Sequence, residues 1–150
     1  MKISLGCDEA AYQLKETIKQ HLQKAGHEGI ANGVGEGEVE LYPDVAVRTC
    51  KKVTDGTCDR GILVCGTGIG MAMTANKVPG IRAAVCHDPF STERSVLSND
   101  ANVMCMGARV IAPQLALYLL DIWMRLTFKN GPSTPKVERI MEYQKEFCGK

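Results

Sequence analysis

The sequence predicts an α/β fold, a three-layer sandwich in which helices cover both faces of a five-stranded parallel sheet. Short apolar runs alternate along the chain with segments whose apolar residues recur at helical spacing. Strand, helix and strand in succession are the unit from which parallel sheets are built. The 150 residues suit one domain, spanning residues 1–150, that buries a sizeable core.

The expected strands are apolar runs bounded by glycine, cysteine or polar residues. They cover residues 2–6, 28–34, 60–64, 82–86 and 103–106. The second run has the weakest pattern, and a loop rich in glycine and glutamate follows it at residues 35–40. Each run is short enough to be a strand and too short to be a membrane span.

The expected helices follow the strands in order. They cover residues 12–25, 42–53, 68–76, 89–97 and 113–126, and a last helix begins at Thr134. Gly26 ends the first helix because glycine is a common residue just after a helix. Thr134 is a good N-cap residue, and Pro135 suits the first helical position.

The helix that begins at Pro113 is apolar on nearly all sides. Its apolar residues are Leu115, Leu117, Leu119, Leu120, Ile122, Trp123, Met124 and Leu126. Such a helix must be covered on more than one side, and one domain supplies only one sheet face. We therefore expect a homodimer or a dimer of dimers. We also expect the linker 129–132 and the last helix, together residues 129–150, to form an arm that packs on the partner subunit.

Composition excludes several classes of partner. The formal net charge is +1 and the basic residues are scattered, so the sequence predicts no nucleic-acid surface and no membrane patch. Seven cysteines without a Cys-x-x-Cys pair indicate free thiols in a reducing compartment, and we expect a cytoplasmic protein. The apolar start of the chain is too short for a signal peptide and is expected to be the first strand.

Residues 65–70, which read Cys-Gly-Thr-Gly-Ile-Gly, follow the central apolar strand directly. In an open α/β sheet, such a strand end faces the ligand crevice. Glycines allow close approach to a ligand, and successive N–H donors favour negative charge. A tight turn with a buried structural thiol is the alternative. A dinucleotide loop is disfavoured because Met71 stands where its last glycine is required.

Polar residues accompany the other strands as well. Asp8 and Glu9 follow the first strand, His87 the fourth and Arg109 the fifth, while Ser98 and Asn99 precede the fifth. Taken singly, Asp8 is an ordinary helix cap, Asn99 a turn residue and Arg109 a surface charge. Together they are expected to meet at one edge of the sheet and form a site.

Six segments in this order and spacing resemble the ribose-5-phosphate isomerase B and galactose-6-phosphate isomerase family. They are residues 6–8 (Gly-Cys-Asp), 42–43 (Tyr-Pro), 65–70, 75–83 (Ala-Asn-Lys-Val-Pro-Gly-Ile-Arg-Ala), 98–102 (Ser-Asn-Asp-Ala-Asn) and 106–110 (Met-Gly-Ala-Arg-Val). The resemblance covers essentially the whole chain. It implies a Rossmann-like fold and an aldose–ketose isomerase of sugar phosphates that uses no metal and no cofactor.

The resemblance also implies roles for individual residues. Cys65 is the expected base, moving a proton between C2 and C1 of the open-chain sugar through a cis-enediolate. Thr67 is expected to pass a proton between the two oxygens. Asp8 and Asn99 are expected to hold sugar hydroxyls, and Arg109 the phosphate or a hydroxyl. The main-chain N–H groups of four residues suit a developing oxyanion: Gly66, Gly68, Ile69 and Gly70.

The chain departs from the family pattern at four positions. Glu9 and Ser98 stand where many members carry histidine, and the histidine at the second position is assigned to opening the sugar ring. Pro132 and Lys136 stand where many members carry phosphate-binding arginines. Lysine lacks the bidentate fork of arginine, so anion recognition differs.

These departures leave the substrate open. Ribose 5-phosphate, interconverted with ribulose 5-phosphate, is the first choice, and a hexose 6-phosphate is possible. A tetrose 4-phosphate cannot close a five-membered ring, so it needs no ring-opening group and suits Ser98. His87 is a candidate for a relocated ring-opening acid or base. A non-catalytic subunit of the same fold and, more weakly, a nucleotide-binding module are the alternatives of another class. His21 and His27 are expected to be structural.

Overall fold

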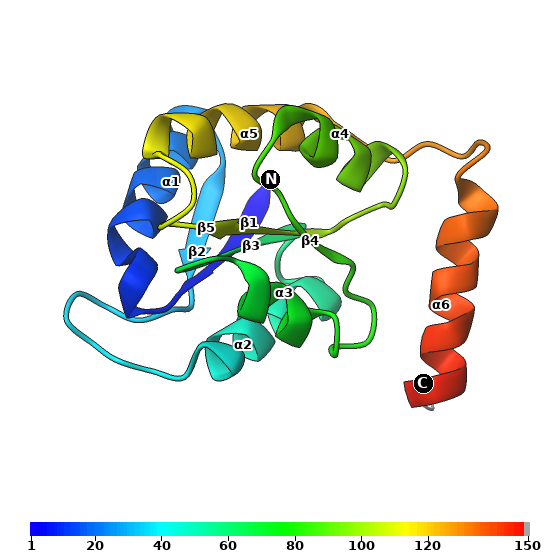
Figure 1. Ribbon diagram of the computed structural model, residues 1–150, viewed down its shortest axis with the longest axis horizontal. Coiled ribbons are helices and arrows are strands. Elements are labelled where there is room, and N and C mark those ends of the chain that lie inside the picture. Colours follow the sequence, from blue (N-terminus) through cyan, green and yellow to red (C-terminus); the bar gives the residue numbers. More distant parts are fainter. Residues whose placement is uncertain (149–150) are drawn as a thin grey trace.

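The computed structural model describes residues 1–148 and confirms the predicted fold class (Figure 1). Its strands are β1 (Lys2–Cys7), β2 (Glu28–Ala31), β3 (Arg60–Cys65), β4 (Ala83–Val85) and β5 (Val103–Gly107). Its helices are η1 (Glu9–Ala11, a 3-10 turn), α1 (Tyr12–Lys24), α2 (Tyr42–Thr54), α3 (Ile69–Ala75), α4 (Pro89–Leu97), α5 (Pro113–Arg125) and α6 (Thr134–Cys148). β2 and β4 are shorter than the sequence predicts, and the other predicted boundaries differ by at most one residue.

All five strands pair in parallel, in the order β2-β1-β3-β5-β4. Helices α1, α4 and α5 cover one face of this sheet, and α2 and α3 cover the other (Figure 1). Successive residues of a strand alternate between the two faces. In β3, Ile62 and Val64 accordingly pack beneath α1 and α5, while Leu63 and Cys65 pack against α2 and α3.

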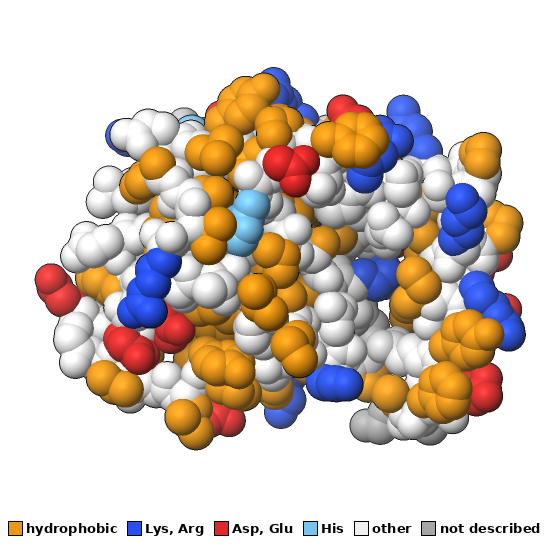
Figure 2. Space-filling model, viewed as in Figure 1, with side chains coloured by type: hydrophobic (Ala, Val, Ile, Leu, Met, Phe, Trp, Pro, Cys, Tyr) orange, Lys and Arg blue, Asp and Glu red, His pale blue; other side chains and the backbone are white. Residues whose placement is uncertain are grey.

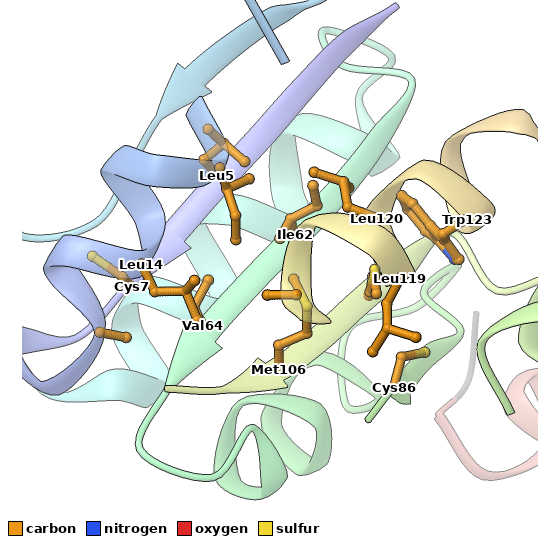
Figure 3. Packing of buried hydrophobic residues seen from close by; sticks show 14 of the residues in the cluster. Leu5, Cys7, Leu14, Ile62, Val64, Cys86, Met106, Leu119, Leu120 and Trp123 are labelled. Atoms are coloured by element: carbon orange, nitrogen blue, oxygen red, sulfur yellow. The ribbon is translucent and has the colours of Figure 1, made fainter. Parts of the chain in front are cut away.

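The larger core lies between the sheet and the pair α1 and α5 (Figure 3). Trp123 is its largest fully buried side chain. Arg60 stacks on the Trp123 ring and donates to the carbonyls of Trp123 (2.8 Å) and Leu126 (2.6 Å), which lie at the end of α5. Burying a large apolar side chain stabilises the fold by about 1.5–3 kcal/mol. The C-terminal end of helix α5 is thus anchored to the start of the central strand β3.

The outer side of α5 is less well covered. Leu119, Leu120 and Trp123 are buried, Ile122 is half-buried and Tyr118 is 55% exposed. The expectation that a partner subunit covers this helix stays a prediction.

Helix α6 stands beside the sheet domain at the edge that ends in β4 (Figure 1). Beyond its own linker, two hydrogen bonds join it to the rest of the described chain. A hollow of about 510 Å³ separates it from β4. The side chains that line this hollow include Arg82, Asn99, Ile140, Tyr143 and Phe147. The last helix therefore forms an arm, as the sequence predicts.

Among residues 1–148, no helix combines the length and the apolar character needed to span a bilayer.

Candidate active site

The connections of the sheet reverse direction between β1 and β3. The chain leaves β1 toward the edge strand β2, and it leaves β3 toward β4 on the other side. At such a switch point the loops at the carboxyl ends of the strands separate and form a crevice for ligands. Asp8 directly follows β1, and Cys65 is the last residue of the neighbouring strand β3. The Asp8 N–H donates to the Val64 carbonyl at 3.4 Å. Both residues lie at the crevice that the sequence predicts.

The Cys65 sulfur is the centre of this edge. The backbone N–H of Gly68 donates to Cys65 Sγ at 3.1 Å, and the Cys65 side chain is 5% exposed. By contrast, the Cys7 and Cys86 thiols donate to carbonyl oxygens. An N–H donor at a helix start stabilises negative charge on sulfur. Among the described cysteines, Cys65 alone accepts a backbone N–H.

Burial keeps the other inner thiols protonated. Desolvation raises the pKa of Cys7 to about 11 and that of Cys50 to about 12. It also raises the pKa values of Cys58, Cys86 and Cys105. A thiol of high pKa is neither a useful base nor a nucleophile at neutral pH. These cysteines are part of the packing.

The loops after β3 and β5 are fastened to each other by main-chain contacts. Ala108 N–H donates to the Cys65 carbonyl at 2.8 Å, and Arg109 N–H donates to the Gly66 carbonyl at 3.0 Å. Gly68 has φ +78°, and a Cβ on it would lie 2.9 Å from the Met106 carbonyl carbon. Glycine is therefore required at Gly68 both for its backbone conformation and for the close packing of the two loops.

The N–H groups of the Cys65 loop divide into used and free donors. Gly68 donates to the sulfur and Ile69 donates to Thr67 Oγ1 at 3.3 Å, so neither is free for an oxyanion as the sequence suggested. Within residues 1–148, the N–H groups of Thr67, Gly70 and Met71 make no hydrogen bond to the chain. Free donors at the start of α3 suit a developing negative charge. The sequence did not single out Met71.

Asp8 is both a cap and a candidate ligand. Its Oδ1 accepts the Ala10 N–H at 3.1 Å, so the expectation of a helix cap is confirmed. Burial raises the pKa of Asp8, the neighbouring charge of Glu9 raises it further, and the Arg109 guanidinium opposes both effects. The Glu9 side chain itself is exposed. A carboxylate that is costly to keep charged is a candidate for binding or catalysis.

Arg109 lies over the Cys65 loop. A Cβ built on Gly66 would lie 3.5 Å from an Arg109 guanidinium nitrogen. The side chain is exposed and forms none of the ion pairs in the described part of the chain. It is a free cation beside Cys65 and Asp8, which is what an anionic ligand requires.

His87 lies at the same edge, at the end of β4. The Gly107 N–H donates to His87 Nε2 at 2.9 Å, so the imidazole is neutral with its proton on Nδ1. Burial lowers the pKa of His87, although the charge of Asp88 opposes this. Only Nδ1 remains for proton exchange with a ligand.

Ser98, Asn99 and Lys136 do not join this group within one chain. Helix α4 carries the chain from the carboxyl edge of the sheet back to the amino edge, so Ser98 and Asn99 lie before β5 begins. The expectation that all of the polar segments meet at one edge is therefore wrong for a single chain. Asn99 instead lines the hollow beside α6, and Lys136 is exposed on the first turn of α6.

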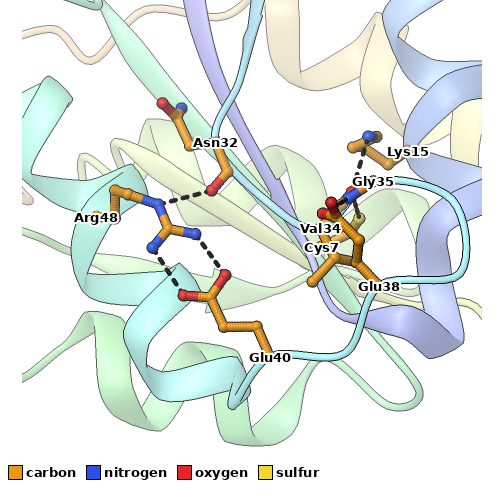
Figure 4. Close-up of polar contacts among 8 residues, drawn as sticks. All are labelled: Cys7, Lys15, Asn32, Val34, Gly35, Glu38, Glu40 and Arg48. Atoms are coloured by element: carbon orange, nitrogen blue, oxygen red, sulfur yellow. Dashed lines mark hydrogen bonds and ion pairs between the residues drawn. The ribbon is translucent and has the colours of Figure 1, made fainter.

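Residues 32–40 form a wall beside the end of β1 (Figure 4). Val34 receives a hydrogen bond from the buried Lys15 Nζ at 3.4 Å. Arg48 joins the two ends of this segment. Its guanidinium donates to both Glu40 oxygens at 2.8 and 2.7 Å and to the Asn32 carbonyl at 2.8 Å. The wall is held in place by charged hydrogen bonds at both ends.

Tyr42 is a neighbour of the site for which the sequence predicted no role. A Cβ on Gly70 would lie 2.7 Å from the Tyr42 ring, so the ring packs directly on the Cys65 loop. The available signal was the Tyr-Pro pair at residues 42–43, which resembles the family but carries no obvious chemistry.

The chain is similar to known proteins over nearly its whole length. The family model described as Ribose/Galactose Isomerase matches residues 3–140. The ribose-5-P isomerase B of Listeria innocua is 50% identical over 142 residues, covering 95% of this chain and 96% of its own. The D-erythrulose-4-phosphate isomerase of Pectobacterium atrosepticum is 47% identical over 145 residues, covering 96% and 95%. The structure of Clostridium thermocellum ribose-5-phosphate isomerase B superposes with a TM-score of 0.95 at 42% identity, covering 98% of this chain and 99% of that chain.

Proposed function

The chain belongs to the ribose/galactose isomerase family, and from this premise we propose that Cys65 is the base of an aldose–ketose isomerization. The protein is a sugar-phosphate isomerase. We propose ribose 5-phosphate and ribulose 5-phosphate as its substrate pair. The observation that carries the role of Cys65 is the Gly68 N–H on its sulfur.

The reaction needs a proton moved between neighbouring carbons. The Cys65 thiolate takes the proton from C2 of the open-chain aldose, and the electron pair moves into the C1–C2 bond while O1 becomes an enediolate oxygen. The same sulfur then returns the proton to C1, which gives the ketose. Thr67 passes the hydroxyl proton between O2 and O1, and the free N–H groups of Gly70 and Met71 stabilise the oxyanion.

Substrate binding falls to the charged residues around the sulfur. Asp8 accepts hydrogen bonds from sugar hydroxyls with the oxygen that does not cap η1. Arg109 supplies positive charge for the phosphate or a hydroxyl. Lys136 is the further phosphate contact, and because it lies on α6 it reaches the site only from a second copy of the chain.

We propose that the active site is completed across a homodimer. One chain has two apolar surfaces. Helix α3 presents Ile69 and Met73, which are 55% and 66% exposed, and the hollow beside α6 is lined by Ile140 and Phe147. A symmetric dimer places α3 of each copy in the hollow of the other. It thereby brings Asn99 from one copy to Cys65 of the other.

The hypothesis of a tetrose phosphate substrate rests on a different observation. Ser98 has no acid or base function at neutral pH, and His87 uses Nε2 on Gly107. An open-chain tetrose phosphate such as erythrulose 4-phosphate needs no ring opening, so it remains the second candidate. A non-catalytic subunit is disfavoured because Cys65, Thr67 and Asp8 surround one crevice. A hexose 6-phosphate is the third substrate to test.

Purified protein assayed alone tests the function. We expect conversion of ribose 5-phosphate to ribulose 5-phosphate that survives a chelator, with deuterium from heavy water incorporated into the product. Parallel assays with erythrulose 4-phosphate and galactose 6-phosphate identify the substrate by kcat/KM. No turnover on any of the three phosphates would favour the non-catalytic alternative.

Mixed dimers test the shared site. Chains carrying Cys65→Ala and chains carrying Asn99→Ala are co-expressed with different tags, and the mixed dimer is isolated. Its second site combines an intact Cys65 with an intact Asn99, so we expect roughly half of the wild-type turnover per dimer. Activity no higher than that of the two parent variants would contradict the exchange of residues between copies.

A further inference from the structure

The turn that carries Asn99 has an unusual backbone. Helix α4 ends at Leu97 with Ser98 as its C-cap, and Asp100 has φ +50°. Asp100 is the single non-glycine residue with positive φ in the described chain. Residues other than glycine rarely adopt this conformation unless neighbours hold them there. The turn at residues 98–100 therefore depends on an outside support.

Arg82 supplies that support. Its Nε donates to the Asp100 carbonyl at 2.6 Å, and its Nη2 donates to Asp100 Oδ2 at 2.8 Å. The Arg82 side chain is 18% exposed, so solvent screens this ion pair only in part. Two donors on one rigid guanidinium fix both the main chain and the side chain of the turn.

The same guanidinium reaches the arm. Arg82 Nη1 donates to Met141 Sδ on α6 at 3.6 Å, and the nearby Gly80 N–H donates to Gln144 Oε1 at 2.9 Å. These are the two hydrogen bonds that join α6 to the sheet domain within residues 1–148. Both start from the short segment before β4.

That segment is itself held firmly. The Asn102 side chain accepts the Arg82 N–H at 2.8 Å and donates to the Gly80 carbonyl at 2.9 Å. Arg82 also lines the hollows on both sides of its contact with α6, one of which is lined by Asn99 and the other by Val137. In the space-filling view the surface is deeply hollowed between the arm and the sheet domain (Figure 2).

We propose that Arg82 is a positioning residue that joins the 98–100 turn and helix α6 into one unit. In the proposed dimer this unit presents Asn99 and Lys136 together to the crevice of the other copy. The proposal rests on the shared site described above. Arg82 itself touches no substrate and acts through the two elements that it holds.

The substitution Arg82→Lys tests the geometry with the charge retained. A lysine ammonium has no planar fork, so it cannot hold Asp100 and Met141 at the same time. Small displacements of positioning groups lower rates strongly, and we expect kcat/KM to fall by about 10- to 100-fold for Arg82→Met and by less for Arg82→Lys. Arg125→Met is the matched control, because it removes an exposed arginine whose side-chain hydrogen bond, among the described residues, stays within its own helix.

A double-variant cycle separates positioning from general destabilisation. If Arg82 acts through the turn, Asn99→Ala already removes what Arg82 positions on that side. The combined variant Arg82→Lys, Asn99→Ala should then lose less activity than the product of the two single losses. Independent, multiplying losses would overturn the proposal, as would an Arg82→Lys variant with wild-type kcat/KM.

Mixed dimers assign the copy on which Arg82 acts. We pair Cys65→Ala chains with Arg82→Lys chains and compare them with the pair Cys65→Ala and Asn99→Ala. Recovery in both pairs supports the proposal, because the intact turn then comes from the Cys65→Ala chain. Recovery in the Asn99 pair alone would overturn the role of Arg82 while the shared site stands. Recovery in neither pair would overturn the shared site and, with it, this inference.

Discussion

Gly107 donates its backbone N–H to His87 Nε2 at 2.9 Å, so a side chain at the end of β4 fixes the end of β5. The residue that follows β5, Ala108, donates its N–H to the Cys65 carbonyl at 2.8 Å. The imidazole therefore belongs to the framework of the Cys65 loop. This contact also leaves Nδ1 as the only nitrogen of His87 that can exchange a proton with a sugar.

His87→Gln separates the framework role of His87 from ring opening. The glutamine carbonyl can accept the Gly107 N–H, but it cannot exchange protons. If Nδ1 opens sugar rings, kcat/KM should fall by about 100-fold or more for ribose 5-phosphate and little for erythrulose 4-phosphate, as general acid–base catalysis contributes 10²–10⁴-fold. Equal losses on both substrates would remove His87 from ring opening, and His87→Ala shows the cost of losing the framework contact.

The lowered pKa of His87 predicts how stability changes with pH. Burial favours the neutral imidazole in the folded chain, so the folded pKa lies below the unfolded value of 6.5. The unfolded chain therefore binds the proton first, and stability falls as the pH drops through about 6.5 toward the folded pKa. Thermal unfolding at several pH values should show a larger loss for the wild type than for His87→Gln. Parallel curves would contradict the assignment.

Removing the sulfur tests the proposed base. Cys65→Ala and Cys65→Ser should fold, because the side chain is small, and should lower kcat by about 10²–10⁴-fold, since proton transfer loses its acceptor. Steady-state kinetics and the circular dichroism spectrum check the two parts of this expectation. Cys148→Ser, at an exposed cysteine, is the control. Near-normal turnover in Cys65→Ala would exclude the thiol from the mechanism.

Asp8→Asn should change stability and activity in opposite directions. The raised pKa of Asp8 means that the folded chain holds the carboxylate at a cost, which appears as the pH rises above 3.8 through the folded pKa and persists at neutral pH. Asparagine keeps an oxygen for the Ala10 N–H and removes that charge. We expect a higher melting temperature at neutral pH and kcat/KM lower by about 10- to 100-fold, the effect of losing a charged hydrogen bond. A lower melting temperature would contradict the cost ascribed to burial.

Gly68→Ala should disturb the sulfur and the fold together. An alanine there combines a positive φ with a Cβ 2.9 Å from the Met106 backbone. We expect a loss of about 1–3 kcal/mol in the free energy of unfolding and a lower kcat, because the loop must shift its N–H off the sulfur. Gly56→Ala is the matched control, since Gly56 has φ +79° with nothing within 4 Å of a Cβ. Denaturant titration of both variants isolates the effect of the contact.

Periodicity predicted the five strands and helices α1 to α5, because most of these elements bury one face against the sheet or a neighbour. The turn η1 was not predicted, and α6 was expected from Thr134 as its N-cap and Pro135. The predicted second strand, residues 28–34, is longer than β2, although the Asn32 and Val34 N–H groups still donate to the Leu5 and Cys7 carbonyls at 2.7 and 3.2 Å. The predicted fourth strand, residues 82–86, begins before β4 does, because the Arg82 N–H donates to the Asn102 side chain. Contacts of this kind depend on side chains far apart in the sequence, which a local pattern does not contain.

The site was predictable in part. Residues that directly follow parallel strands share one edge, so Asp8, Cys65, His87 and Arg109 were placed correctly. Ser98 and Asn99 were misplaced, although residues that precede a strand lie at the amino edge. The donors that act on Cys65 Sγ and His87 Nε2 were not predictable, because they depend on how two loops pack. The support of Asp100 by Arg82 had no signal beyond the family resemblance.

The backbone N–H on the Cys65 sulfur distinguishes this cysteine from the five of raised pKa, with a practical consequence for labelling. Alkylating reagents react with thiolates that they can reach, and five inner thiols have raised pKa values. Mass spectrometry of native protein treated with iodoacetamide should therefore find fast modification at the exposed Cys148 and slower modification at Cys65, which is 5% exposed. In a Cys148→Ser chain, a single adduct would then report directly on the occupancy of the crevice, because a bound sugar phosphate would shield that sulfur.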